Sequence, residues 1–232
     1  MSIASEITRI QAAKADIKAS IEAKGVTVPS DTLIDQYADY VDQIQTGGGQ
    51  AEEDLKNLIE RDITSITIPS GTTIIGNHIF VGCTELTSVT IPNSVTIIGQ
   101  NTFQNCSGLT SITIPNSVTA ISMDAFNGCR GLTSITIPNG VTSMAVRVFN
   151  GCSGLTSITI GNSITRINTN AFSGCSSLTS VTINTTTPPS LVENAFTNTN
   201  NCPIYVPSES VDAYKAATNW SSYADRIQAI SE

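Results

Sequence analysis

The chain repeats itself every 23 residues over most of its length, and this period limits the folds that it can adopt. The unit is clearest from Leu109 to Gly131, where it is LTSITIPNSVTAISMDAFNGCRG. A period of this length is typical of a solenoid, in which one coil cannot bury its apolar face alone and neighbouring coils share a core. The repeats begin at Ile63, Leu86, Leu109, Leu132, Leu155 and Leu178.

The spacing within one unit predicts how each coil folds. Ile112 and Ile114 alternate with polar residues as in a β-strand, and Pro115 ends the strand because proline lacks the N–H that a ladder needs. Gly128 supplies a permissive turn, and Cys129 behaves as a small apolar residue. The positions expected to point inward are Leu109, Ile112, Ile114, Val118, Ile121, Ala125, Phe126 and Cys129, followed one coil later by Leu132, Ile135, Ile137, Val141, Met144, Val148, Phe149 and Cys152.

The recurring L-T-S-I-T-I-P…AF…C pattern resembles the BspA-type (Treponema-type) leucine-rich repeat. The resemblance covers about residue 63 to the C-terminus and implies a curved right-handed leucine-rich-repeat solenoid with a parallel β-sheet face. It also implies display on a surface for adhesion. The departures are Thr72 for an apolar residue, Gly161 and Asn184 for the strand-ending proline, and Asn201 for the next leucine. The fold class that we predict is therefore α+β, with a small helical N-terminal module before a solenoid of six 23-residue coils over residues 63–200.

Both ends of the solenoid carry candidate caps. Residues 51–62 have apolar residues on one helical face and acids in the first turn, which predicts an N-terminal capping helix. Residues 201–232 are predicted to form a C-terminal cap, with a seventh strand at 204–207 and a helix that contains Val211 and Tyr214. The only tryptophan, Trp220, is expected to seal this end, because a terminal coil needs a lid. An exposed Trp220 would instead indicate a ligand platform.

Residues 1–46 precede a glycine-rich linker at 47–50 and have two amphipathic helical patterns. They predict either a helical hairpin or a short coiled coil, and isoleucine at both core positions of a heptad favours a homo-trimer. Residues 7–29 and 33–45 also resemble the helical segment that opens many tail-associated proteins of bacteriophages and prophages. That resemblance implies attachment to other virion proteins through residues 1–46. It agrees with the lack of a secretory apolar region at the start of the chain.

Charge excludes some functions. The net charge is −8 with an isoelectric point near 4.5. The repeats hold few charged side chains, so no basic stripe is available for a nucleic acid. No apolar run is long enough for a membrane span. The charged residues within residues 63–200 are Glu85, Asp124, Arg130, Arg147, Arg166 and Glu193.

The cysteines recur in one slot of the repeat, which predicts a column of buried thiols rather than disulfides or a metal site. A zinc site needs clustered ligands, and the spacing here provides none. His78 is the sole histidine and is expected at the surface or in a cap. The sequence has no nucleophile, metalloprotease or phosphate-loop motif, so we expect no catalytic residues and no cofactor. The column comprises Cys83, Cys106, Cys129, Cys152 and Cys175.

The outward strand positions are the candidate ligand-binding residues. Serine and threonine should form two parallel columns of hydroxyls, which are either solvated strand formers or a flat, uncharged face for a glycan or a protein loop. The columns comprise Ser88, Thr90, Ser111, Thr113, Ser134, Thr136, Ser157 and Thr159, and Ser65, Thr67, Ser180 and Thr182 extend them. Variation at Ala120, Met123, Asp124 and Arg147 makes the back and edges an alternative binding region.

These patterns predict a non-enzymatic binding or adhesion protein that recognises a protein or glycan on a bacterial or host surface. With the N-terminal resemblance, we expect a phage or prophage tail component located in the virion. The alternatives are a purely structural virion component and a BspA-type adhesin on the bacterial cell surface.

Overall fold

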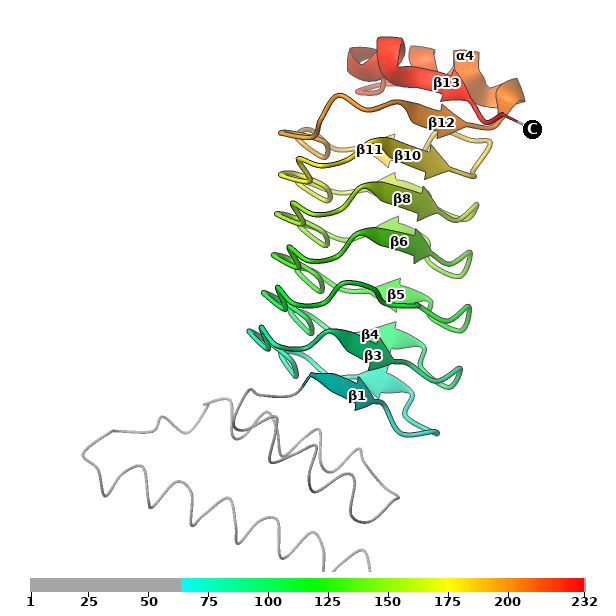
Figure 1. The fold of residues 1–232 in the computed structure, drawn as a ribbon. Helices are drawn as coiled ribbons and strands as arrows, with labels where there is room; N and C mark the ends of the chain where they lie inside the picture. The colour runs from blue at the N-terminus through cyan, green and yellow to red at the C-terminus, as the bar shows by residue number, and fades with distance from the viewer. Residues whose placement is uncertain (1–63, 232) are drawn as a thin grey trace, which may run out of the picture.

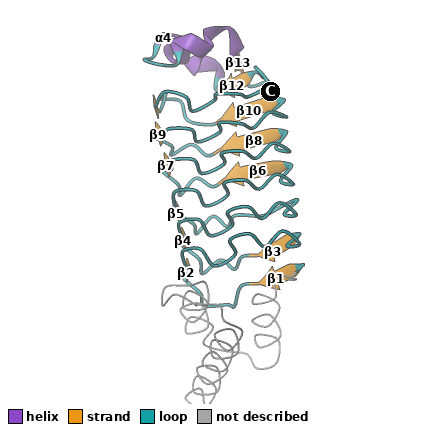
Figure 2. Ribbon diagram, turned by 90° about the vertical axis from the view of Figure 1, so that its left-hand side faces the viewer, coloured by secondary structure: helices purple, strands orange, loops and turns teal. Residues whose placement is uncertain are grey.

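The structure, a computed structural model, describes residues 64–231 as a stack of coils that rises from β1 to β13 (Figure 1). Most coils contribute one short strand to the front face, where the strands form two sheets, and most contribute a second strand to the back (Figure 2). This is a parallel β-solenoid with few helices, as the repeat predicts. The predicted helices of residues 1–46, the linker 47–50 and the capping helix 51–62 lie outside the described residues.

The front strands pair in parallel, and each residue lies beside its counterpart one coil away. Ser134 lies beside Ser157, for example, and Ser157 beside Ser180. The front strands are β1 (Ser65–Thr67), β3 (Ser88–Thr90), β6 (Ser134–Ile137), β8 (Ser157–Ile160), β10 (Ser180–Ile183), β12 (Ile204–Val206) and β13 (Ile227–Ala229). Strand β6 ends immediately before Pro138, which is the position that the repeat assigns to the strand terminator.

The back strands form two separate three-stranded sheets. The first comprises β2 (Ile74–Ile75), β4 (Ile97–Ile98) and β5 (Ala120–Ile121), and the second comprises β7 (Ser143–Met144), β9 (Arg166–Ile167) and β11 (Ser190–Leu191). The ladder is thus open between β5 and β7.

The core runs the length of the stack, and all of the inward positions predicted from the two central repeats are buried. One phenylalanine from each coil stacks on the next. The ring centroids of Phe80 and Phe103 lie 5.2 Å apart, and those of Phe149 and Phe172 lie 6.0 Å apart. Parallel rings at these distances combine apolar burial with aromatic contact, which explains why this slot is phenylalanine in each coil.

The thiol column is buried beside the phenylalanines, and within residues 64–231 no cysteine forms a disulfide. The thiol of Cys129 donates a hydrogen bond of 3.0 Å to the carbonyl of Phe103, and Cys152 donates one of 3.1 Å to Phe126. The prediction of buried thiols is confirmed. Beyond this prediction, the structure adds a bond from the thiol to the main chain of the previous coil.

A second column consists of residues with a left-handed backbone, which the sequence analysis did not identify. Asparagine tolerates this conformation because its short polar side chain bonds locally. The column is His78, Asn101, Asp124, Arg147, Asn170 and Asn194, with φ between 52° and 65°. The half-buried His78 therefore occupies an asparagine slot of the repeat.

Arg147 is the unusual member of this column, because a long side chain has no local bond to favour a positive φ. It forms an ion pair through two hydrogen bonds with Asp124 in the previous coil. Arg147 Nε donates to Oδ1 of Asp124 at 2.9 Å, and Nη2 donates to Oδ2 at 2.7 Å. Burial opposes ionisation of Asp124, which is 4% exposed, but hydrogen bonds from Arg147 and Asn127 outweigh it. The pKa of Asp124 therefore lies below its ordinary value.

The C-terminal end is closed by a lid that keeps the repeat length, since β13 begins 23 residues after β12 and pairs with it. Between them run a 3-10 turn (Ser208–Ser210), α4 (Val211–Ala216) and a second 3-10 turn (Ser221–Arg226). Trp220 is fully buried, and its ring centroid lies 6.2 Å from that of Phe196. Its Nε1–H donates a hydrogen bond of 2.7 Å to the carbonyl of Pro189. This burial excludes Trp220 as a ligand platform.

The thiol column predicts slow chemistry with thiol reagents. Burial raises the pKa of Cys175 to about 12 and that of Cys129 well above its ordinary value, and only the thiolate is reactive. We expect the native chain to resist a disulfide reagent at pH 8 and all six thiols to react in denaturant. Rapid modification of Cys129 in the native chain, detected by mass spectrometry, would contradict this prediction.

The ion pair predicts a rescue. Arg147→Asn leaves the buried Asp124 carboxylate without its main partner and should lower the free energy of unfolding by about 1 kcal/mol, since Arg147 is partly exposed. The double variant Asp124→Asn with Arg147→Asn restores the asparagine column and should recover the loss.

The pH dependence of the single variant provides the control. Because the pKa of Asp124 is lowered in the folded chain, the ion pair stabilises the fold above a pH of about 3.9 and loses its effect as the pH falls further. The difference between wild type and Arg147→Asn, measured by chemical denaturation, should therefore shrink under acid conditions. A constant difference would show that the arginine acts through packing.

Candidate functional site

The strand face, defined as the outward serines and threonines of the front strands, is the surface that the repeat predicts for binding. Ser134, Ser157 and Ser180 form one column, and Thr136, Thr159 and Thr182 form the other. A third group, Ser65 and Thr67 with Ser88 and Thr90, forms the same two columns on β1 and β3.

The two hydroxyl columns do not lie on one continuous sheet. Ser111 and Thr113 are exposed, but residues 111–114 belong to neither front ladder. The bond from the Thr110 N–H to the Thr87 carbonyl is 3.4 Å, whereas the equivalent bond from Thr156 to Thr133 is 2.8 Å. The strand face is therefore divided at this coil, because loose main-chain contacts do not maintain a ladder.

The upper part of the strand face ends in a feature that the repeat does not contain. Tyr205 on β12 pairs with Thr182 and places a half-exposed aromatic ring at the end of the threonine column. Aromatic residues are enriched in binding hot spots. Residues 204–207 are predicted to form a strand, and the alternation of inward Ile204 and Val206 with Tyr205 is the sequence signal for this outward ring.

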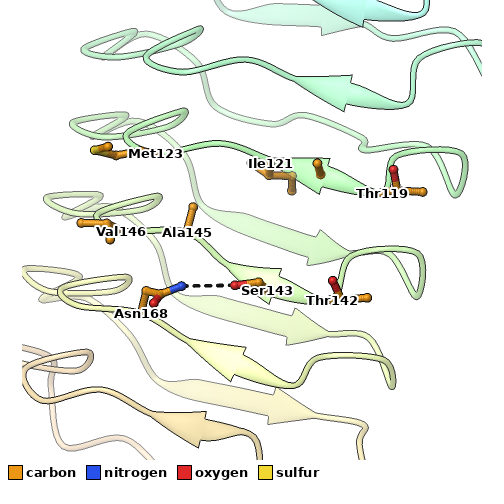
Figure 3. Close-up of a pocket in the computed structure, with 9 residues that line it drawn as sticks. Thr119, Ile121, Met123, Thr142, Ser143, Ala145, Val146 and Asn168 are labelled. Atoms are coloured by element: carbon orange, nitrogen blue, oxygen red, sulfur yellow. Dashed lines mark hydrogen bonds between the residues drawn. The ribbon is translucent and has the colours of Figure 1, made fainter.

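The second candidate surface is the back groove, a cavity of about 360 Å³ on the back face between β5 and β7. Figure 3 shows Ile121 and Thr119 on one coil facing Ala145, Ser143 and Thr142 on the next. The groove is defined by Thr119, Ala120, Ile121, Met123, Thr142, Ser143, Ala145, Val146 and Asn168.

The groove exists because main-chain bonds are missing at this level. In the neighbouring coils, the N–H of Thr119 donates to the carbonyl of Thr96, and the N–H of Thr165 donates to the carbonyl of Thr142, both at 2.8 Å. Within residues 64–231, the corresponding N–H of Thr142 has no bond to Thr119, and that of Ala145 has none to Ile121.

The edge beside the groove stays closed. The N–H of Asp124 donates to the carbonyl of Val146 at 3.1 Å, and the N–H of Phe126 donates to the carbonyl of Val148 at 3.0 Å. The opening therefore affects the sheet faces of this junction and not the turn edge that carries the Asp124–Arg147 pair. The coil above the groove has Met144 and Val148 in slots where its neighbours have Ile121 and Ala125, a substitution that is visible in the sequence.

The described residues contain no grouping that would hold a metal ion. They also have no helix that is long and apolar enough to cross a membrane. The structure brings together some of the residues whose variation marks the back and edges as an alternative binding region. Ala120 and Met123 line the groove, and Asp124 and Arg147 form an ion pair beside it.

The open ladder predicts uneven amide exchange. The amides of Thr142 and Ala145 should exchange with solvent faster than those of Thr119, Thr165 and Asn168, which donate to the coil below. Hydrogen exchange resolved by NMR would measure this. Equal protection at all five positions would mean that the ladder is closed in solution.

Comparisons with known proteins agree with the repeat. A leucine-rich repeat protein of T. pallidum is similar over 71% of this chain and 85% of that chain, at 24% identity and a TM-score of 0.52. The pneumococcal vaccine antigen PcpA is similar over 74% of this chain and 42% of that chain, at 24% identity and a TM-score of 0.61. At this identity, both likenesses show the fold alone.

No curated protein matches the chain. A family model described as "BspA type Leucine rich repeat region (6 copies)" matches residues 58–169 and 97–223. Because these matches together cover well over half of the sequence, the chain belongs to the BspA-type leucine-rich repeat family.

Proposed function

We propose that this chain is a non-enzymatic adhesion protein whose solenoid binds a protein or glycan on a cell surface. The observation that supports this most directly is the strand face over β6, β8 and β10. It presents uncharged hydroxyl side chains in register, above a core that fixes their positions. A rigid, repeated face suits recognition, because little side-chain freedom is lost when a partner binds.

The side chains of the strand face do not favour a catalytic function. The strand columns contain no titratable side chain, and the Asp124 carboxylate is buried in an ion pair. General acid–base chemistry needs a group that can exchange a proton with substrate near the working pH. Binding, rather than turnover, is therefore the function that these residues favour.

The location of the protein is part of the proposal. The resemblance of residues 7–29 and 33–45 to phage tail segments favours display on a virion, where the solenoid would recognise a bacterial surface. Membership of the BspA-type family favours the alternative, an adhesin on the bacterial cell surface. Virion genes beside the coding gene would favour the first location, and their lack would favour the second.

The strand face predicts that a single charged substitution will impair binding. Thr136→Lys places a long charged side chain among the exposed hydroxyls and should weaken retention of bacterial envelope fractions on the immobilised chain by about tenfold or more. Ser176→Lys adds the same charge at an exposed turn position and is the matched control. If both variants retain envelope material as the wild type does, the strand face is not the binding surface. If the wild type retains none, the adhesion function is wrong.

A further inference from the structure

The geometry points to a second ligand site, in which the back groove binds a short neutral glycan of one or two sugar rings. This site is additional to the strand face and rests on the same binding role. The observation that carries it is the missing rung between β5 and β7, because it leaves main-chain groups facing a cavity instead of each other (Figure 3).

The groove offers both kinds of hydrogen-bonding group. The N–H groups of Thr142 and Ala145 are free donors, and the carbonyls of Thr119 and Ile121 that would accept from them are free acceptors on the facing coil. Main-chain groups of this kind bind water or a ligand when no protein group is available. A sugar ring carries hydroxyls that donate and accept, so one ring can meet both sets.

A side-chain hydroxyl adds to this set. In the adjacent coils, Thr119 Oγ1 donates to the carbonyl of Thr96 at 3.3 Å, and Thr165 Oγ1 donates to that of Thr142 at 3.0 Å. Within the described chain, the Thr142 hydroxyl has no such bond, because the carbonyl that it would reach belongs to the opened coil. It is therefore free to bond a ligand.

The apolar part of the groove suits the C–H face of a sugar. Met123 is exposed by 36% although it is a large apolar residue, and its sulfur lies 3.6 Å from Nη2 of Arg147. Half-buried Ala145 and Val146 supply the rest of this surface, and the buried Ile121 lies at its floor. Exposed apolar area in a hollow, together with a few convergent polar groups, is the usual composition of a small-ligand site, and a volume of 360 Å³ lies at the lower end of the range of about 300–1,000 Å³ for such sites.

Charge and size favour a neutral sugar over other ligands. The residues that line the groove carry no charge, and Asp124 and Arg147 beside it neutralise each other. One cation adjoins the groove, because Arg166 donates from Nε to Oδ1 of the lining residue Asn168 at 2.7 Å. A cationic ligand would thus lose its hydration without gaining a partner, and an anionic ligand would have to compete with Asn168 for Arg166. A peptide would need a strand edge of several residues to pair with, whereas β5 and β7 are two residues long and face each other.

The next coil provides a substitution that closes the groove without damaging the fold. Asn168 occupies the slot of Ala145, and its Nδ2 donates to the Met144 carbonyl at 2.9 Å and to the Ser143 hydroxyl at 3.2 Å. By the same geometry, Ala145→Asn would place an amide donor on the free carbonyl of Ile121 and occupy the cavity. We expect this variant to be at least as stable to heat as the wild type.

The test is binding of the full-length chain to an array of neutral bacterial glycans, followed by saturation-transfer NMR with the best oligosaccharide. The wild type should bind, and Ala145→Asn and Met123→Ala should each weaken binding by about tenfold. Gln100→Ala, at the slot of Met123 in the coil below, lies outside the groove and should have no effect. Magnetisation should reach the sugar from the methyl groups of Met123 and Val146.

The outcomes separate this site from the adhesion function. If glycan binding survives Ala145→Asn but is lost in Thr136→Lys, the glycan binds the strand face and the groove site is wrong. Retention of envelope proteins without any glycan binding also overturns the groove site and leaves the adhesion function standing. If the wild type binds neither glycan nor envelope material, both proposals fail. An Ala145→Asn chain with a lowered melting temperature would be replaced by Met123→Ala as the deciding variant, since Met123 is exposed.

Discussion

The structure depends on the contact between one coil and the next. A single coil of 23 residues has an apolar interior but no second layer to cover it, so its leucine, isoleucine, phenylalanine and cysteine side chains are sheltered only when another coil lies above and below. Three sets of main-chain bonds hold neighbouring coils together, on the front face, on the back face and along the turn edge. The phenylalanine stack follows the turn edge and continues through the described coils, which is why this edge stays closed where the faces open.

This dependence explains both the uniformity of the protein and its exceptions. Since each coil must match its neighbours, a slot that works once is repeated, and the result is a column of identical side chains. Departures are tolerated where a neighbour compensates. Arg147 stands in a slot that suits asparagine, and the Asp124 carboxylate one coil away holds it in place. The coil at 204–226 replaces the turn-edge segment with α4 and two 3-10 turns, and Trp220 covers the last phenylalanine.

The same dependence places the two candidate surfaces in different physical settings. The strand face is rigid and polar because every hydroxyl is held by a paired strand, so it suits a flat partner. The back groove lies where pairing stops, so its main chain is available to a ligand. A solenoid can therefore carry one site made by perfect repetition and another made by its local failure, and the two need not bind the same molecule.

Much of this protein was determined by the sequence alone. The 23-residue period fixes the stacking, and the alternation around Ile112 and Ile114 fixes which side chains are inside. The recurring cysteine predicts buried thiols, because five equivalent positions cannot pair evenly. These predictions succeeded because they depend on local periodicity, which one coil passes unchanged to the next.

The tertiary structure decided which coils pair in a ladder and which side chains meet between coils, because the 23-residue period does not specify either. Whether two coils share a ladder depends on distances of a few tenths of an ångström between main-chain atoms, and the sequence around Thr113 obeys the repeat although its ladder is open. The position of Tyr205 beside Thr182, the burial of Trp220 and the pairing of Asp124 with Arg147 arise between residues that are brought together only by stacking. The sequence therefore determines the coil, while the packing of one particular coil on another determines where a ligand can bind.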